Sequence, residues 1–183
     1  MHQKIACKFI VVFDLEATCD DGGRMSPVEM ETIEIGAVMV KRDGLNVISE
    51  FQRFVRPIRH SRLTDFCTAL TSIGQADVDG AQLLPDVVAE LKTWLYEYSD
   101  LIACSWGDYD VRQLQQDCRM HGIAYPFPGR HVNLKRRFSE AQGITKKLGM
   151  AQALELARLP LVGTAHRGID DARNIAQLLP HCI

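Results

Sequence analysis

Two apolar segments with β-branched residues, and a third that alternates more loosely, follow one another at the start of the chain, and they constrain its fold more than any other feature. They cover residues 8–14, 32–41 and 47–55. Between them lie two turn signals, Gly22-Gly23 and Asp43-Gly44, of which the second favours a tight hairpin. This pattern predicts three consecutive strands arranged as an antiparallel meander.

The pattern changes after Pro57, where helical periodicity alternates with two short apolar runs. The runs at 101–105 and 131–134 predict short strands. Helices are expected at residues 63–70, 85–98, 111–121, 136–142, 148–158 and 169–179. The order of elements predicts an α/β fold in which one mixed sheet, an antiparallel meander plus parallel strands, is flanked by helices.

The chain's 183 residues suffice for one sizeable core, so we expect a single domain over residues 1–183. With 21 basic and 23 acidic residues the net charge is −2, so no overall positive field attracts a polyanion. A nucleic acid would have to be held by a local patch or by metal ions. Apolar runs stay far below the ~20 residues of a membrane span, and no targeting segment is recognisable, so we expect no membrane association.

The six cysteines form no C-x-x-C pair and show no spacing typical of a metal site. Most lie among apolar neighbours, as in Ile102-Ala103-Cys104, which predicts buried, reduced thiols. Reduced thiols are typical of cytoplasmic proteins, and we expect this protein in the cytoplasm.

Two carboxylates close the first predicted strand, in the stretch Phe13-Asp14-Leu15-Glu16. Because side chains alternate along a strand, Asp14 and Glu16 share one face and Leu15 turns to the other. Like charges this close raise each other's pKa, and a divalent cation such as Mg²⁺ or Mn²⁺ is the usual remedy. The alternative is a pair of solvated carboxylates at a strand end.

A second acidic group, Asp108 and Asp110, follows the predicted strand at 101–105 where the chain turns into a helix. Ligand sites collect at such strand ends in α/β sheets. An aspartate at a helix start is also an ordinary N-cap. Asp108 suits the cap better, which leaves Asp110 in the first turn.

The third group is His166, followed by Gly168, Asp170 and Asp171, ahead of an Ala-rich helical run. A histidine can take up a proton near neutral pH, and a neighbouring carboxylate could bind metal beside it. Helical spacing alone favours Asp170 as the partner of His166. If Gly168 keeps His166 in a loop, Asp170 caps the helix and Asp171 faces the site, and the spacing does not decide between these two arrangements.

Together, four carboxylates from three segments and one histidine predict a two-metal hydrolase site. Such sites hold two ions ~3.5 to 4 Å apart, which activate a water and stabilise the leaving oxygen of an in-line phosphoryl displacement. The reaction class is phosphodiester hydrolysis.

These residues resemble the three exonuclease motifs of the DEDDh class, which lie at residues 13–19, around Asp110, and from His166 to Asp171. The resemblance is to the histone-mRNA 3'-end exonuclease (Eri-like) subfamily and its bacterial relatives, and it covers about residues 8–179. Further stretches carry it: Arg56-Pro57, Leu63-Thr64-Asp65-Phe66-Cys67, Leu70-Thr71-Ser72-Ile73 and Gly168-Ile169-Asp170-Asp171-Ala172-Arg173-Asn174-Ile175-Ala176. Ser72 stands where the subfamily commonly has glycine.

The resemblance implies a ribonuclease-H-like fold and 3'-to-5' removal of nucleoside 5'-monophosphates from single-stranded RNA or DNA, with RNA favoured and two Mg²⁺ or Mn²⁺ ions as cofactors. It assigns general-base catalysis to His166, with Glu16 also in the catalytic set. The metal ligands it implies are Asp14, Glu16, Asp110 and Asp171. The substrate contacts it implies are Ala17 and Thr18 at the terminal nucleotide and Phe66 and Tyr109 stacked on its base, with core packing as the alternative for the two aromatics.

With 183 residues we expect no room for the accessory RNA-binding domain of some relatives, and a structured-RNA substrate is therefore not the one we favour. Basic side chains that could grip phosphates, or simply form solvated faces, are Arg56, Arg59 and Arg62, Lys135-Arg136-Arg137, and Lys146-Lys147.

Two other functions compete. A haloacid-dehalogenase-type phosphatase is suggested because the strand end Asp-x-Glu-x-Thr imitates that family's nucleophile motif, with Asp14 as the phosphorylated residue. Glu16 as the second acid and the unused His166 argue against it. A nucleic-acid-binding module without activity is the other alternative, but all five chemical positions are present.

Overall fold

Strand β1 (Phe9–Ala17) is the central strand of the sheet, because its apolar residues can be buried on both faces. The structure, a computed structural model, describes residues 7–182. The five strands lie in the order β3-β2-β1-β4-β5. β2 (Thr32–Lys41) and β3 (Asn46–Phe54) complete an antiparallel meander, and β4 (Leu101–Ser105) and β5 (Val132–Asn133) add parallel strands. The predicted mixed sheet is confirmed.

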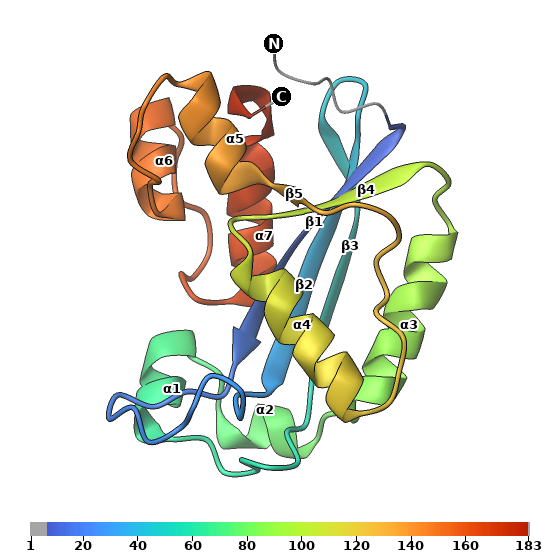
Figure 1. Cartoon of the computed structure of the whole chain (residues 1–183), viewed down its shortest axis with the longest axis vertical. Helices are drawn as coiled ribbons and strands as arrows, with labels where there is room; N and C mark the ends of the chain where they lie inside the picture. The colour runs from blue at the N-terminus through green and yellow to red at the C-terminus, as the bar shows by residue number, and fades with distance from the viewer. Residues whose placement is uncertain (1–6, 183) are drawn as a thin grey trace.

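Helices cover both faces of this sheet (Figure 1). α3 (Leu84–Tyr96) and α4 (Tyr109–Met120) bury the face that carries Val11 and Phe13. α5 (Leu134–Ala141), α6 (Met150–Ala157) and α7 (Gly168–Gln177) pack on the opposite face with Ile10 and Val12, followed by a 3₁₀ turn at Leu179–His181. α1 (Asp65–Thr71) and α2 (Gln75–Asp79) close the end of the sheet where β1 finishes.

The pairing between β1 and β4 ends before β1 does. The two strands pair from Phe9 with Leu101 to Val12 with Cys104, whereas β1 stays paired with β2 as far as Ala17. The last part of β1 therefore has no strand on its β4 side. Crevices of this kind, at the carboxyl ends of neighbouring strands, are where α/β proteins place their ligand sites.

Gly36 on β2 allows α7 to begin directly against the sheet. A Cβ atom at this position would overlap the backbone of Gly168 and Ile169, so no larger residue fits without moving the helix. This close approach brings the first turn of α7 beside the end of β1, and the α7 residue Gly168 lies next to the backbone of Asp14.

The structure corrects some details of the prediction. α2 was not predicted, because five residues are too few to show a helical period. The turn at Asp43-Gly44 is present, but residues 42–45 form a four-residue connection between Lys41 and Asn46 rather than a tight two-residue hairpin. Gly44 and Leu45 both adopt positive φ angles there, at 78° and 51°.

Within residues 7–182, every helix is too short or too polar to cross a membrane.

Candidate active site

Asp14 and Glu16 lie on the face of β1 that α7 covers, at the point where β4 has left the strand. Leu15 turns to the other face and packs with Val11 and Phe13. Glu16 is buried at 8% exposure and Asp14 is half-buried. The alternation predicted for these carboxylates is therefore what the strand shows.

Asp110 reaches the same crevice from the first turn of α4. It is 5% exposed, and its Oδ1 accepts a hydrogen bond of 3.2 Å from the backbone N–H of Leu15, a donor that β4 leaves unpaired. Asp108 occupies the N-cap position, as predicted, although its side chain makes no capping hydrogen bond. The start of α4 therefore gives Asp108 and Asp110 different places: Asp108 stands at the N-cap, and Asp110 points into the crevice.

α7 contributes Asp171, and the loop before it contributes His166. The N–H of His166 donates to Asp171 Oδ2 at 3.2 Å, and the exposed histidine has a left-handed backbone with φ at 59°. Arg167, not Asp170, is the N-cap residue of α7. Asp170 lies in the first turn and accepts the N–H of Thr164 at 2.9 Å, so the expectation that Asp170 caps the helix is wrong. The rest of that alternative agrees with the structure, because His166 lies in the loop before α7 and Asp171 faces the site.

These segments bring Glu16, His166 and Asp171 together, with one potential ligand atom of each within 4.8 Å of the others. Asp14 and Asp110 adjoin this group. Burial raises the pKa of Asp14 well above its usual range, and the charges of Asp110, Glu16 and Asp171 raise it further. The four carboxylates therefore belong to one electrostatic unit.

The other three acids respond to the same environment. Burial, and then the charge of Asp171, raises the pKa of Glu16 to about 8. Burial raises the pKa of Asp110 to about 6, although hydrogen bonds from Leu15 and Ser105 oppose the change. Burial also raises the pKa of Asp171. At neutral pH this crevice concentrates negative charge that protons or cations must offset.

The donor set fits a hard divalent cation. Asp171 Oδ1 is buried and has no hydrogen-bond partner among residues 7–182. The ion pairs of Arg53, Arg136, Arg167 and Arg173 are made with other acids, and Arg167 lowers the pKa of Glu16 less than burial and the neighbouring carboxylates raise it. Carboxylate oxygens without competing donors are the ligands that Mg²⁺ and Mn²⁺ prefer.

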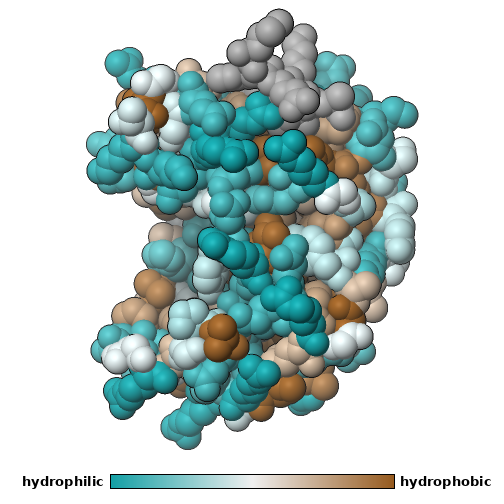
Figure 2. All heavy atoms as spheres, in the orientation of Figure 1, coloured by the Kyte–Doolittle hydropathy of each residue, from teal (hydrophilic) through white to brown (hydrophobic). Residues whose placement is uncertain are grey.

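The four residues expected to contact substrate lie around the end of β1. Phe66 and Tyr109 are 39% and 45% exposed, whereas Ala17 and Thr18 are buried. Of these four residues, Phe66 lines a cavity of about 490 Å³, together with Arg24, His60 and Thr64 and the acids Asp20, Asp21 and Asp65. The surface is hollowed at this level, between α6 and α1 (Figure 2).

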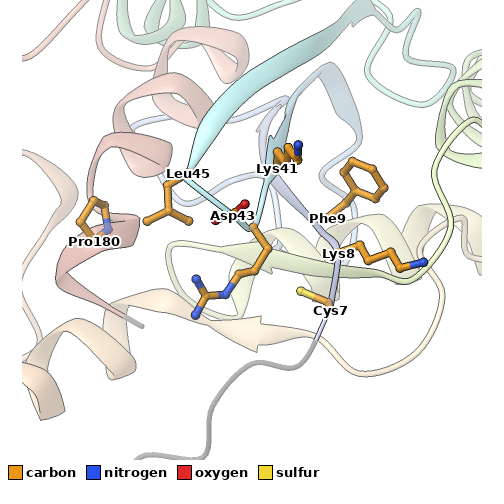
Figure 3. A pocket seen from close by; sticks show the side chains of 9 residues that line it. Cys7, Lys8, Phe9, Lys41, Asp43, Leu45 and Pro180 are labelled. Atoms are coloured by element: carbon orange, nitrogen blue, oxygen red, sulfur yellow. The ribbon is translucent and has the colours of Figure 1, made fainter.

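A larger cavity of about 830 Å³ lies at the opposite end of β1 (Figure 3). Lys8, Phe9, Lys41 and Leu45 line it, and Asp43 is its one acid among the described residues. It is therefore separate from the carboxylate cluster and does not share its chemistry.

Sequence reasoning missed one buried acid next to the site, Glu34 on β2. Its side chain is completely buried and forms an ion pair with Arg167, 3.0 Å from Oε2 to Nε. The sequence did contain a signal for it, because an acid within the apolar segment 32–41 indicates a buried charge that needs a partner. Its partner could not be inferred, because Arg167 is 133 residues away in the chain.

Comparisons with known proteins agree with this geometry. The chain is 30% identical to 3'-5' exoribonuclease 1 of Rattus norvegicus over 93% of its own length and 51% of that protein's, so it spans about half of the curated relatives it matches. The nuclease domain of 3'hExo, a DEDDh family member bound to rAMP, superimposes with a TM-score of 0.83 at 29% identity, covering 94% of this chain and 90% of that one.

A second solved structure, of a 3'-exonuclease that recognises the histone mRNA stem-loop at its 3' end, gives a TM-score of 0.88 at 28% identity over 94% of this chain and 62% of the other. These similarities confirm the resemblance to the DEDDh class and the ribonuclease-H-like fold. The Exonuclease family model (RNase_T) matches residues 11–179, a stretch that includes all five residues of the carboxylate and histidine cluster, and the chain belongs to this family.

Proposed function

We propose that this chain is a 3'-to-5' exonuclease that removes nucleoside 5'-monophosphates from the 3' ends of single-stranded nucleic acid, with RNA favoured over DNA. The observation that carries the proposal is the meeting of Asp14, Glu16, Asp110, Asp171 and His166 in one crevice. The names of the relatives support RNA as the substrate.

The four carboxylates are proposed to hold two Mg²⁺ or Mn²⁺ ions. The raised pKa values of Asp14 and Glu16 and the unpartnered Oδ1 of Asp171 support this assignment. When bound, such ions lower the pKa of water and stabilise charge that develops on the leaving oxygen. Two ions also suit the number of ligands, because a single ion would leave carboxylate charge uncompensated.

His166 is proposed to act as the general base that takes a proton from the attacking water. It is exposed at the mouth of the crevice and close to Glu16 and Asp171. Imidazole exchanges protons near neutral pH, which is the requirement for this role. The neighbouring carboxylate of Asp171 would stabilise the imidazolium that results.

Phe66 and Tyr109 are proposed to stack on the terminal base, while Ala17 and Thr18 border its sugar. The exposure of both aromatic rings beside the site supports stacking over core packing. Base stacking on an aromatic ring contributes ~1 to 3 kcal/mol and accepts any base. Thr18 acts partly through structure, because its Oγ1 accepts the N–H of Glu31 at 3.0 Å.

The loop that carries Arg56, Arg59 and Arg62 is proposed to contact phosphates of the bound strand. Its backbone is fixed by the buried Glu31, whose carboxylate accepts three N–H groups, from Ile58, Arg59 and His60, each at 2.8 Å. A rigid loop of exposed arginines is suited to a polyanion. The clusters at 135–137 and 146–147 are further from the proposed base-stacking residues in sequence, and they remain secondary candidates.

We also propose that residues 1–183 work as one domain in the cytoplasm. The free thiols of Cys67, Cys104, Cys118 and Cys182 are buried, which suits a reducing compartment. Residues 1–6 and 183 of this proposed domain lie outside the described residues.

The test is digestion of 5'-labelled and 3'-labelled single-stranded RNA and DNA, with Mg²⁺ or with EDTA. An exonuclease of this polarity gives a ladder of shortening 5'-labelled products and immediate release of labelled mononucleotide from the 3' end, only with the metal. Internal fragments from the first time points, or activity unaffected by EDTA, would contradict the proposal. Intact oligonucleotide with hydrolysis of p-nitrophenyl phosphate would favour the phosphatase, and intact oligonucleotide that is nevertheless bound would favour the inactive binding module.

A further inference from the structure

We propose that Glu34 is a positioning residue, which fixes the backbone at Arg167 and Gly168 and thereby places His166 over the carboxylate cluster. This inference rests on the proposed function, because it concerns the residue proposed there as general base. Glu34 itself touches neither water nor substrate, since its side chain is completely buried.

Three of the four hydrogen bonds that Glu34 accepts come from Arg167 and Gly168. Oε2 accepts the Arg167 Nε–H and the Gly168 N–H, both at 3.0 Å. Oε1 accepts Arg167 Nη2 at 3.3 Å and Gln52 Nε2 at 3.0 Å. A carboxylate with four donors has no free position for a metal ion, in contrast to Asp171, whose Oδ1 has no donor in the described part of the chain.

These contacts immobilise two consecutive residues. The Arg167 side chain is held by Glu34 on one side, and its guanidinium carbon lies 5.2 Å from the centre of the Phe54 ring. The N–H of Gly168, the first residue of α7, donates to the same carboxylate. Glu34 on β2 therefore caps this helix from the sheet. A negative charge at a helix N-terminus is also favoured by the helix dipole.

His166 directly precedes this fixed pair and has a left-handed backbone. Such a conformation is unfavourable for a residue with a side chain, and it persists only where the surroundings impose it. The structure shows two constraints on it: the His166 N–H bonded to Asp171, and the anchored Arg167-Gly168 backbone on its C-terminal side. Without the anchored Arg167-Gly168 backbone, His166 can return to a backbone conformation with negative φ, and its ring then moves away from the carboxylates.

A purely structural ion pair explains the arrangement less well. Buried pairs contribute little to stability compared with apolar residues of the same size. Glu34 also adds a negative charge beside acids that already repel one another, and it raises the pKa of Asp14, Glu16 and Asp171, although burial is the larger cause. A buried negative charge at this place increases the repulsion among the carboxylates. Its role in placing His166 explains why an acid stands there nevertheless.

The test compares Glu34→Gln and Arg167→Met with Arg53→Met as a matched control. Arg53 makes the same kind of contacts at the surface, with Glu90 at 2.8 Å and the Phe51 ring at 5.2 Å. Each variant is measured for kcat, KM and half-saturating Mg²⁺ on a 5'-labelled single-stranded oligonucleotide. A displacement of about 1 Å in a catalytic group lowers the rate by up to ~10²-fold, so we expect kcat to fall ~10- to 100-fold with KM and Mg²⁺ dependence within about twofold.

The decisive measurement repeats Glu34→Gln in a His166→Ala background. If Glu34 acts through His166, the second substitution has no further effect once the histidine is gone. Equal losses in both backgrounds would overturn the proposal, as would a loss confined to KM or to Mg²⁺ affinity. Arg167→Lys should recover part of kcat, and Arg53→Met should leave it unchanged.

Hydrogen exchange provides a readout that needs no activity. Arg167→Met should speed exchange at residues 163–168, including the His166 and Gly168 amides, and Arg53→Met should not. Unchanged exchange overturns the positioning role even if Glu34→Gln fails to fold. If the wild-type protein degrades no nucleic acid, the proposed function fails, while the exchange result still decides whether Glu34 fixes this loop.

Discussion

Replacing Glu16 by glutamine should stabilise the metal-free protein, and the effect should depend on pH. The folded state raises the pKa of Glu16 from 4.5 to about 8, because the carboxylate is buried among other acids. A raised pKa means that the folded state holds the proton more tightly than the unfolded chain. The contribution to stability is therefore complete below pH 4.5 and is lost as the pH rises through about 8.

The magnitude follows from the size of the change in pKa. A rise from 4.5 to about 8 corresponds to a loss of about 5 kcal/mol at high pH. Glutamine removes this loss, but its buried amide gives up hydrogen bonds to water at a cost of about 1 to 3 kcal/mol. We expect a net gain of about 2 to 4 kcal/mol at pH 9, which corresponds to a Tm higher by about 5 to 15 °C.

The assay is thermal unfolding in EDTA at pH 5, 7 and 9, with Glu155→Gln as the control because Glu155 is an exposed helical acid. The Tm of Glu16→Gln should be equal to or below that of wild type at pH 5, where only the cost of the buried amide acts, and it should exceed that of wild type at pH 9. Glu155→Gln should follow wild type throughout. Added Mg²⁺ should raise the Tm of wild type more than that of Glu16→Gln, most strongly at pH 9. A variant less stable than wild type at pH 9 in EDTA would refute the electrostatic argument.

The remaining predictions address single residues. Asp14→Asn should abolish Mg²⁺-dependent degradation while circular dichroism shows an intact fold, and retained nuclease activity would contradict the metal-ligand role. His166→Ala should lower kcat by ~10² to 10⁴ with Mg²⁺ half-saturation nearly unchanged, as expected for a lost general base. Phe66→Ala should raise KM by roughly 5- to 150-fold, the equivalent of ~1 to 3 kcal/mol of stacking, with a smaller effect on kcat. Ser72→Gly should stabilise the protein in urea by up to about 1 kcal/mol, because Ser72 ends α1 with φ at 60°.

Local patterns in the sequence predicted a large part of the fold. The segment 32–41 matches β2, and 101–105 matches β4, because both are apolar runs bounded by polar residues or turns. The shared face of Asp14 and Glu16 follows from strand alternation alone, and the inward position of Asp110 follows from a helix that starts just before it. These features depend on neighbours in sequence, which a pattern can reveal.

Features set by distant contacts could not be predicted. The spacing left Asp170 and Asp171 as alternatives, since the choice depends on where α7 begins, and Gly36 on β2 allows that start to press against the sheet. The ion pair between Glu34 and Arg167 is invisible for the same reason. α2 was missed because it is only five residues long.

The order in which the crevice is built along the chain has a consequence for synthesis. Asp14 and Glu16 belong to the first strand, whereas His166 and Asp171 follow α6, which ends at Ala157. Chains emerge from the ribosome N-terminus first. A nascent polypeptide that has emerged only as far as α6 thus carries the early acids without the histidine and the final acid of the site, so the proposed nuclease stays inactive until α7 has also emerged and packed against β2.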